Sequence, residues 1–128
     1  MYDAIIVGAR CAGSPTAMLL ARKGYRVMLI DKAIFPSDVV NGYYLHQTAV
    51  ARLKRWGLLD KLRAYNCLPL RTLTFDFGAF ALTGSPPPAD DVVEGYALRR
   101  TVLDKLLIEA AVEAGAELQE RFTVQELV

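Results

Sequence analysis

Two short apolar runs set the pattern of hydrophobic and polar positions near the amino terminus. Ala4–Val7 and Val27–Ile30 are continuously apolar and do not alternate with polar positions. Runs of this length and uniformity are typical of strands buried on both faces of a parallel sheet. Between the two runs, alanines and a glycine recur at helical spacing. This spacing predicts a helix over residues 12–23 that lies close to the sheet, ended by Gly24.

The turn between the first strand and this helix is suited to binding an anion. Backbone N–H groups and the positive end of the helix dipole converge there, on the space that a pyrophosphate would occupy. Asp31 ends the second strand, at the offset of about 20 residues from which an acid accepts hydrogen bonds from adenosine ribose hydroxyls. An acid at this position disfavours a 2′-phosphate. We therefore expect the ADP half of a dinucleotide to be held by Gly8, Ala9, Arg10, Cys11, Ala12, Gly13 and Asp31.

Arg10 is where this turn departs from the usual pattern of three glycines. The middle glycine normally lets the backbone approach the pyrophosphate without a Cβ in the way, and here an arginine replaces it. Its guanidinium could compensate by a charge-assisted contact with the phosphates. The alternative is an exposed arginine that points to water, and the sequence does not decide between the two.

The rest of the chain predicts further elements of an α/β domain. The pattern predicts helices over residues 46–56 and 58–64. Apolar and polar residues alternate over Arg71–Phe77, which predicts a half-exposed strand that forms a hairpin through a turn at Gly78-Ala79. Residues 84–91 contain three consecutive prolines and read as a stiff loop. An amphipathic helix containing Leu103–Ala114 and ended by Gly115, then one or two strands over 117–124, complete the pattern. We expect one Rossmann-like βαβ domain over residues 1–128, with a parallel sheet and a small β-hairpin excursion.

Several stretches of the chain resemble one family of flavoproteins. They are Tyr2–Gly8 followed by Cys11–Ser14, the acid and base Asp31-Lys32, Phe35-Pro36 followed by Gly42, and the helix Arg100–Leu107. Together they resemble the N-terminal FAD-binding part of FAD-dependent oxidoreductases of the aromatic-hydroxylase (flavin monooxygenase) and geranylgeranyl-reductase type. Ser37 stands where these proteins carry an arginine. The resemblance implies FAD as the cofactor, adds Lys32 to the cofactor-binding residues, and implies that Arg100 reaches back toward the cofactor; the alternative for Arg100 is a plain helix-start residue.

The resemblance also implies an activity, which is that of an oxidoreductase acting on a small organic substrate. In such enzymes NAD(P)H is the reductant, and the reduced flavin reacts with oxygen or a double bond. The family's later glycine–aspartate and aspartate–glycine pairs are absent from these 128 residues, so we expect the domain to be incomplete at its C-terminus and inactive alone. No catalytic residue is assigned. The alternatives are a non-catalytic fragment that binds an adenine dinucleotide and, with less support, an NAD-dependent dehydrogenase.

Composition and charge exclude several classes of binding partner and site. The net charge is +1 and the basic residues form no stripe, so we expect no nucleic-acid partner. The absence of a membrane-length apolar run or a signal-peptide pattern leads us to expect a cytoplasmic protein. The two cysteines lack metal spacing, and the single histidine, His46, is assigned no catalytic role. Cys11 could be a reactive thiol at the helix start, but a small residue in a tight turn is the preferred interpretation.

Overall fold

The computed structural model describes residues 1–40, 42 and 44–126. The chain divides into two compact units, of which the first comprises Met1–Val40 and Arg99–Val128 and the second comprises Asn41–Leu98. The candidate dinucleotide-binding residues all belong to the first unit.

The first unit is built on a parallel sheet of three strands. Strand β1 (Ala4–Val7) pairs with β2 (Val27–Ile30), and β2 pairs with β8 (Glu117–Gln119), so that the strand order is β1-β2-β8. Both pairs are parallel, with Val7 opposite Ile30 and Ile30 opposite Gln119. The predicted parallel sheet is therefore confirmed, and the region expected to supply one or two late strands supplies one.

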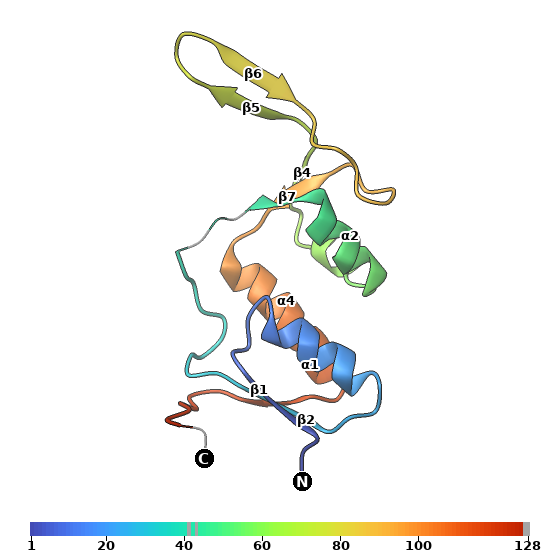
Figure 1. Ribbon diagram of the computed structural model, residues 1–128, viewed down its shortest axis with the longest axis vertical. Helices are drawn as coiled ribbons and strands as arrows, with labels where there is room; N and C mark the ends of the chain where they lie inside the picture. Colours follow the sequence, from blue (N-terminus) through green and yellow to red (C-terminus); the bar gives the residue numbers. More distant parts are fainter. Residues whose placement is uncertain (41, 43, 127–128) are drawn as a thin grey trace. The chain divides into compact units, whose positions relative to one another are not determined.

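Two helices form a layer beside this sheet. Helix α1 (Gly13–Ala21) connects β1 to β2, and α4 (Arg100–Glu113) precedes β8. Because parallel crossovers are right-handed and the strand order runs in one direction, both helices belong on the same face of the sheet. Figure 1 shows α1 and α4 side by side, and small side chains such as Ala17 and Ala111, both fully buried, let them pack closely. Within the described residues, no helix is both long and apolar enough to cross a bilayer.

The opposite face of β1 corrects one expectation. Ile5 is 60% exposed and Val7 63% exposed, so β1 is not buried on both faces. Its inward residues face α1, where the methyl Cγ2 of Ile6 lies 3.1 Å from the position of a Cβ on Gly13. With both crossover helices on one side, no helix among the described residues of this unit covers the other face of the sheet. The continuous apolar run therefore predicted the strand correctly, but the prediction that both of its faces are buried was wrong.

A close contact between the glycine turn and α1 fixes the start of the helix. A Cβ built on Gly13 would lie only 1.7 Å from the carbonyl oxygen of Gly8. No side chain can occupy that position unless the backbone of the turn moves. Gly8 itself has φ +104°, a left-handed conformation that side chains rarely adopt. Gly24, with φ +88°, follows α1 as expected.

Replacing Gly13 by alanine should therefore destabilise the first unit strongly. The new methyl group collides with a backbone oxygen rather than with a side chain that can rotate away, and we expect a loss of about 3 kcal/mol in the free energy of unfolding. Gly84→Ala is the matched control, because an added Cβ there meets nothing within 4 Å. Urea unfolding followed by circular dichroism measures both variants. Equal stability of Gly13→Ala and Gly84→Ala would contradict the close contact.

The second unit combines two helices, a small antiparallel sheet and a hairpin. Helices α2 (Gln47–Arg55) and α3 (Leu59–Arg63) lie within the predicted ranges and are separated by Gly57 at φ +77°. The structure adds a sheet that the sequence pattern did not predict, with strand order β3-β7-β4, and its strands are Tyr44–Leu45 (β3), Gly95–Ala97 (β7) and Pro69–Leu70 (β4). A Cβ on Gly95 would lie 2.5 Å from the hydroxyl oxygen of Tyr44, so β3 and β7 can approach only at a glycine.

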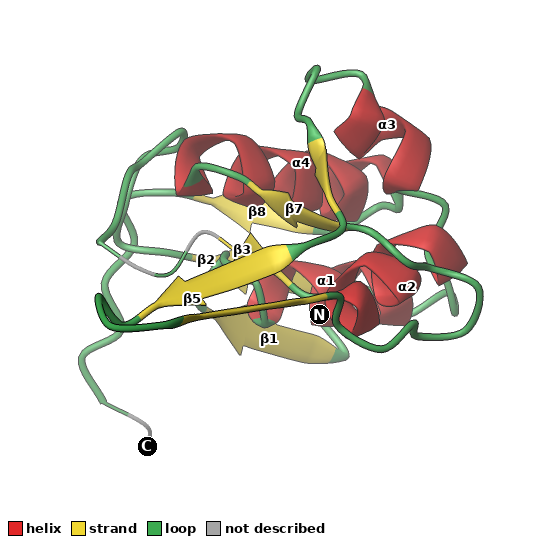
Figure 2. Cartoon of the chain, turned by 90° about the horizontal axis from the view of Figure 1, so that it is seen from above, coloured by secondary structure: helices red, strands yellow, loops and turns green. Residues whose placement is uncertain are grey.

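The predicted hairpin is confirmed as strands β5 (Leu73–Asp76) and β6 (Ala81–Gly84), joined through Gly78 at φ +81° (Figure 2). Its aromatic side chains remain in contact with solvent. Phe75 is 62% exposed, and the rings of Phe77 and Phe80 stack with their centroids 5.0 Å apart. The strand expected to be half-exposed is therefore more exposed than its alternating pattern indicated.

Candidate site for the ADP half of a dinucleotide

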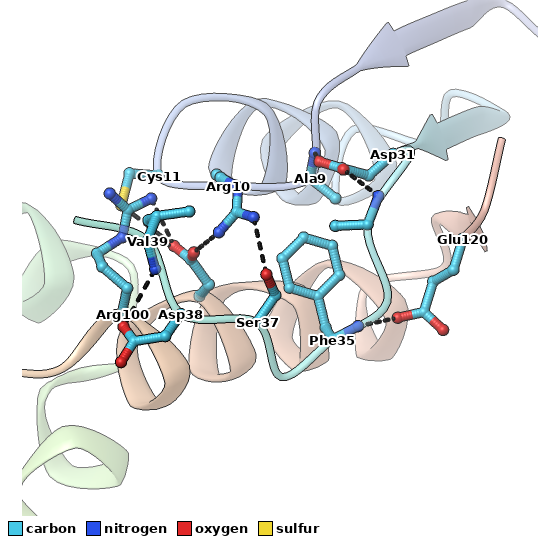
Figure 3. Close-up of polar contacts among 12 residues, drawn as sticks. Ala9, Arg10, Cys11, Asp31, Phe35, Ser37, Asp38, Val39, Arg100 and Glu120 are labelled. Atoms are coloured by element: carbon cyan, nitrogen blue, oxygen red, sulfur yellow. Dashed lines mark hydrogen bonds and ion pairs between the residues drawn. The ribbon is translucent and has the colours of Figure 1, made fainter. Parts of the chain in front are cut away.

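Asp31 ties the glycine turn to the end of strand β2. Its Oδ2 accepts the Ala9 N–H at 2.8 Å, and its Oδ1 accepts the Ala33 N–H at 2.8 Å (Figure 3). The Gly8 N–H also donates to the Ile30 carbonyl at 2.7 Å. Each oxygen of an ionised carboxylate can accept a second hydrogen bond. Asp31 can therefore hold the turn and still accept hydrogen bonds from a ligand's hydroxyl groups.

The amino-terminal end of α1 lacks the usual protein groups that neutralise a helix dipole. The N-cap residue, Ala12, provides no side-chain hydrogen bond, and the first turn contains no acidic residue. The hydroxyl oxygen of Ser14 is fully buried and has no hydrogen-bond partner among the described residues. Such a helix end favours an anion, because neither a capping side chain nor an acidic residue of its first turn compensates its partial positive charge.

A pocket of about 380 Å³ opens beside the turn. Four of the predicted site residues line it, namely Gly8, Arg10, Asp31 and the exposed Lys32. The volume falls within the usual range for small-molecule sites. Sequence reasoning missed the remaining wall, for which no motif gives a signal; it is formed by Val7, Ala33, Phe122, Thr123 and Val124.

The guanidinium of Arg10 is held by three other side chains. Its Nη1 donates to Asp104 Oδ2 at 2.7 Å, its Nη2 donates to Ser37 Oγ at 3.2 Å, and its carbon Cζ lies 5.0 Å from the centre of the Phe35 ring. Figure 3 shows Arg10, Phe35 and Ser37 pointing toward one another. The side chain is 26% exposed. It is therefore a positioned arginine at the wall of the pocket and not a free surface arginine.

Arg100 belongs to the same cluster. It is 7% exposed, and its Nε and Nη2 donate to Asp104 Oδ1 at 3.1 and 2.9 Å. Because Arg10 and Arg100 share one carboxylate, the structure brings the start of α4 next to the glycine turn. Arg100 is therefore a buried, doubly bonded arginine at the start of α4, and its contact with the cofactor stays a prediction.

Sequence reasoning did not single out Asp104, the centre of this cluster. Asp104 is fully buried on α4 and accepts bonds from both arginines and from the Cys11 thiol at 3.4 Å. The only local signal was its spacing of four residues from Arg100, which is common on exposed helix faces. Its second partner, Arg10, lies far away in the sequence.

The environment of Cys11 argues against a reactive thiol. Partial burial of the sulfur raises the pKa of the Cys11 thiol; the Arg100 charge lowers it by less, and the Asp104 carboxylate raises it further. The thiolate is the nucleophilic form. A raised pKa therefore keeps Cys11 protonated near neutral pH, even though the residue is exposed.

Alkylation should test this environment directly. In a Cys67→Ser background, which leaves Cys11 as the single thiol, we expect iodoacetamide to react more slowly at neutral pH than with a short cysteine peptide. The rate should rise as pH increases beyond the usual cysteine pKa, because the thiolate forms only there. A pH series followed by mass spectrometry measures the profile. A rate already at its plateau at neutral pH would contradict the raised pKa.

The arrangement of β1, glycine turn, α1, β2 and terminal acid defines the class of dinucleotide-binding α/β domains. A family model described as "FAD binding domain" matches residues 1–127. The chain belongs to this family, and the cofactor of the domain is FAD.

Two curated relatives illustrate what the chain is similar to. Rifampicin monooxygenase from Rhodococcus hoagii is 35% identical over 123 residues, which cover 93% of this chain and 24% of that protein. Digeranylgeranylglycerophospholipid reductase 2 from Methanothermobacter thermautotrophicus is 33% identical over 122 residues, which cover 91% of this chain and 29% of that protein. The chain therefore spans less than a third of the length of these relatives.

Solved structures agree on the fold. A structure of CmlS, described as a flavin-dependent halogenase, is 29% identical, with a TM-score of 0.83 over 96% of this chain and 23% of that one. A flavoprotein/dehydrogenase from Cytophaga hutchinsonii has a TM-score of 0.86 over 98% of this chain and 31% of that one. Its sequence identity is 22%, so it supports the fold alone.

Proposed function

We propose that this chain holds the ADP half of FAD within a flavin-dependent oxidoreductase. One observation carries the proposal: Asp31 holds the glycine turn and lines the adjoining pocket, next to a helix end that has no side-chain cap and no acidic residue in its first turn. A ribose and a pyrophosphate supply the hydroxyl donors and the negative charge that these groups accept. The match of the family model to residues 1–127 supports FAD over the NAD alternative.

The residues divide between two tasks in this proposal. The backbone from Gly8 through Ala9, Arg10, Cys11 and Ala12 to Gly13 faces the pyrophosphate, and Asp31 accepts hydrogen bonds from the adenosine ribose. The cationic side chains, namely Arg10, Lys32 and Arg100, attract the phosphates. The position of Lys32 in the wall of the pocket supports this assignment. So does the position of Arg100, which shares the Asp104 carboxylate with Arg10.

The reaction of the whole protein is proposed from its relatives. FAD, when bound, supplies two-electron redox chemistry, and the protein contributes binding, orientation and electrostatics. The names of the relatives include a monooxygenase and a reductase, which supports an oxidoreductase. We propose in addition that it acts on a small organic substrate with NAD(P)H as reductant. No residue of this chain is assigned a catalytic role. The second candidate is a non-catalytic fragment that binds an adenine dinucleotide. The cytoplasmic location stays a prediction.

Titration of the purified full chain tests the proposal. We expect saturable binding of FAD and of ADP, followed by flavin fluorescence and by isothermal calorimetry. Asp31→Ala should weaken the affinities for FAD and for ADP by at least about tenfold. The variant loses both the proposed hydrogen bonds to the ribose and the bond that holds the turn. The variant also loses the acceptor of two backbone N–H groups, so circular dichroism must show that it remains folded.

Asp38→Asn is the matched control for Asp31→Ala. Asp38 also lies in the first unit, but its carboxylate pairs with the exposed Arg99, and surface pairs of this kind contribute at most about 1 kcal/mol. We expect its FAD affinity to equal that of the wild type. A folded wild-type chain that binds neither FAD nor ADP would contradict the proposed function.

A further inference from the structure

The cluster around Asp104 contains more positive than negative charge. Two guanidinium groups, those of Arg10 and Arg100, share the single carboxylate of Asp104. The carboxylate is fully buried, and a buried charge is tolerated only when it is paired and hydrogen-bonded. The pairing leaves one positive charge in excess beside a pocket and an uncapped helix end. Arg10, whose side chain is partly exposed, can therefore also pair with an anion that enters the pocket.

Within the described part of the chain, both arginines use only some of their hydrogen-bond donors. A guanidinium carries five N–H donors. Among the described residues, Arg10 gives one bond from Nη1 and one from Nη2, and Arg100 bonds through Nε and Nη2. Arg10 also lines the pocket together with Gly8 and Asp31. Its unused donors are therefore at the wall of the proposed ligand site.

The contacts of Arg10 restrict where those donors can point. Asp104 fixes one end of the guanidinium fork, Ser37 accepts from the other end, and the Phe35 ring lies against its face. An arginine immobilised in this way loses less conformational entropy when it binds a ligand than one that moves freely in water. Of these partners, only Asp104 carries a charge, and only Asp104 also bonds Arg100.

We propose that Asp104 is a positioning residue for dinucleotide binding, a role that rests on the proposed function. Asp104 holds Arg10 at the place of the missing middle glycine, with donors available to the pyrophosphate. The carboxylate itself does not touch the ligand. Affinity for a ligand with a pyrophosphate should therefore depend on Asp104, whereas affinity for adenosine should not.

The variant Asp104→Asn separates positioning from simple charge attraction. Removing the buried negative charge makes the cluster more positive, so charge alone would strengthen ADP binding. Positioning has the opposite consequence, because an asparagine NH₂ cannot accept from Arg10 and the arginine is released. In the full chain we expect ADP affinity to fall by about tenfold, because one positioned, charge-assisted hydrogen bond to the pyrophosphate is lost. Adenosine affinity, measured by competition, should change by less than about twofold.

A milder pair of variants covers the case in which Asp104→Asn fails to fold. Arg10→Lys retains the charge at a partly exposed position but loses the planar fork that joins Asp104 to Ser37. We expect ADP affinity to fall while adenosine affinity is retained. Arg22→Lys makes the same chemical change at an exposed position just after α1 and should leave both affinities unchanged.

The outcomes distinguish this inference from the proposed function. The positioning role is overturned if the wild type binds ADP and Asp104→Asn binds it as tightly or more tightly. It is also overturned if Arg10→Lys and Arg22→Lys have the same ADP affinity. Both results leave the proposed function intact. Equal losses of ADP and adenosine affinity would also overturn it, because they indicate general damage to the fold. A folded wild-type chain that binds no ADP would overturn the proposed function and this inference with it.

Discussion

The approach of the Gly8 carbonyl to the backbone of Gly13 is the constraint on which the rest of the site depends. No Cβ fits between them, since one would lie 1.7 Å from the carbonyl oxygen. The contact lets α1 begin close to the end of β1, so that the positive end of the helix dipole points at the turn. Asp31 then fixes the same turn from the side of β2 through the Ala9 N–H. Strand, turn, helix and acid are therefore held together by direct contacts, and the pocket lies beside them.

The buried charges extend this unit to the second crossover helix. Asp104 on α4 bonds Arg10 in the turn and Arg100 in its own helix. A buried ion pair is weak evidence for stability, because desolvation offsets much of the attraction. Its value here lies in geometry, since it places two guanidinium groups beside a helix end that lacks a cap. The replacement of the middle glycine by Arg10 thereby becomes compatible with a phosphate site.

Local patterns predicted the elements, and long-range contacts decided what the patterns could not. The apolar runs predicted Ala4–Val7 and Val27–Ile30 to the residue, and glycines marked the ends of three helices. The exposed face of β1 was missed because burial depends on which layers cover a sheet, not on the strand's own sequence. Strands β3, β4 and β7 are two or three residues long and carry no detectable period. Asp104 was missed because its deciding partner, Arg10, is distant in the sequence. The ligand contacts of the site residues stay predictions.

An NMR titration tests the central claim, that the glycine turn and Asp31 form one site for an ADP group. With ¹⁵N-labelled full chain, ADP should shift the backbone amide signals of Gly8, Ala9 and Gly13 together with those of Asp31 and Lys32. Amides of the hairpin, such as those of Thr74 and Thr83, should stay in place. Shifts confined to the second unit, or absent from the turn at saturating ADP, would contradict the account.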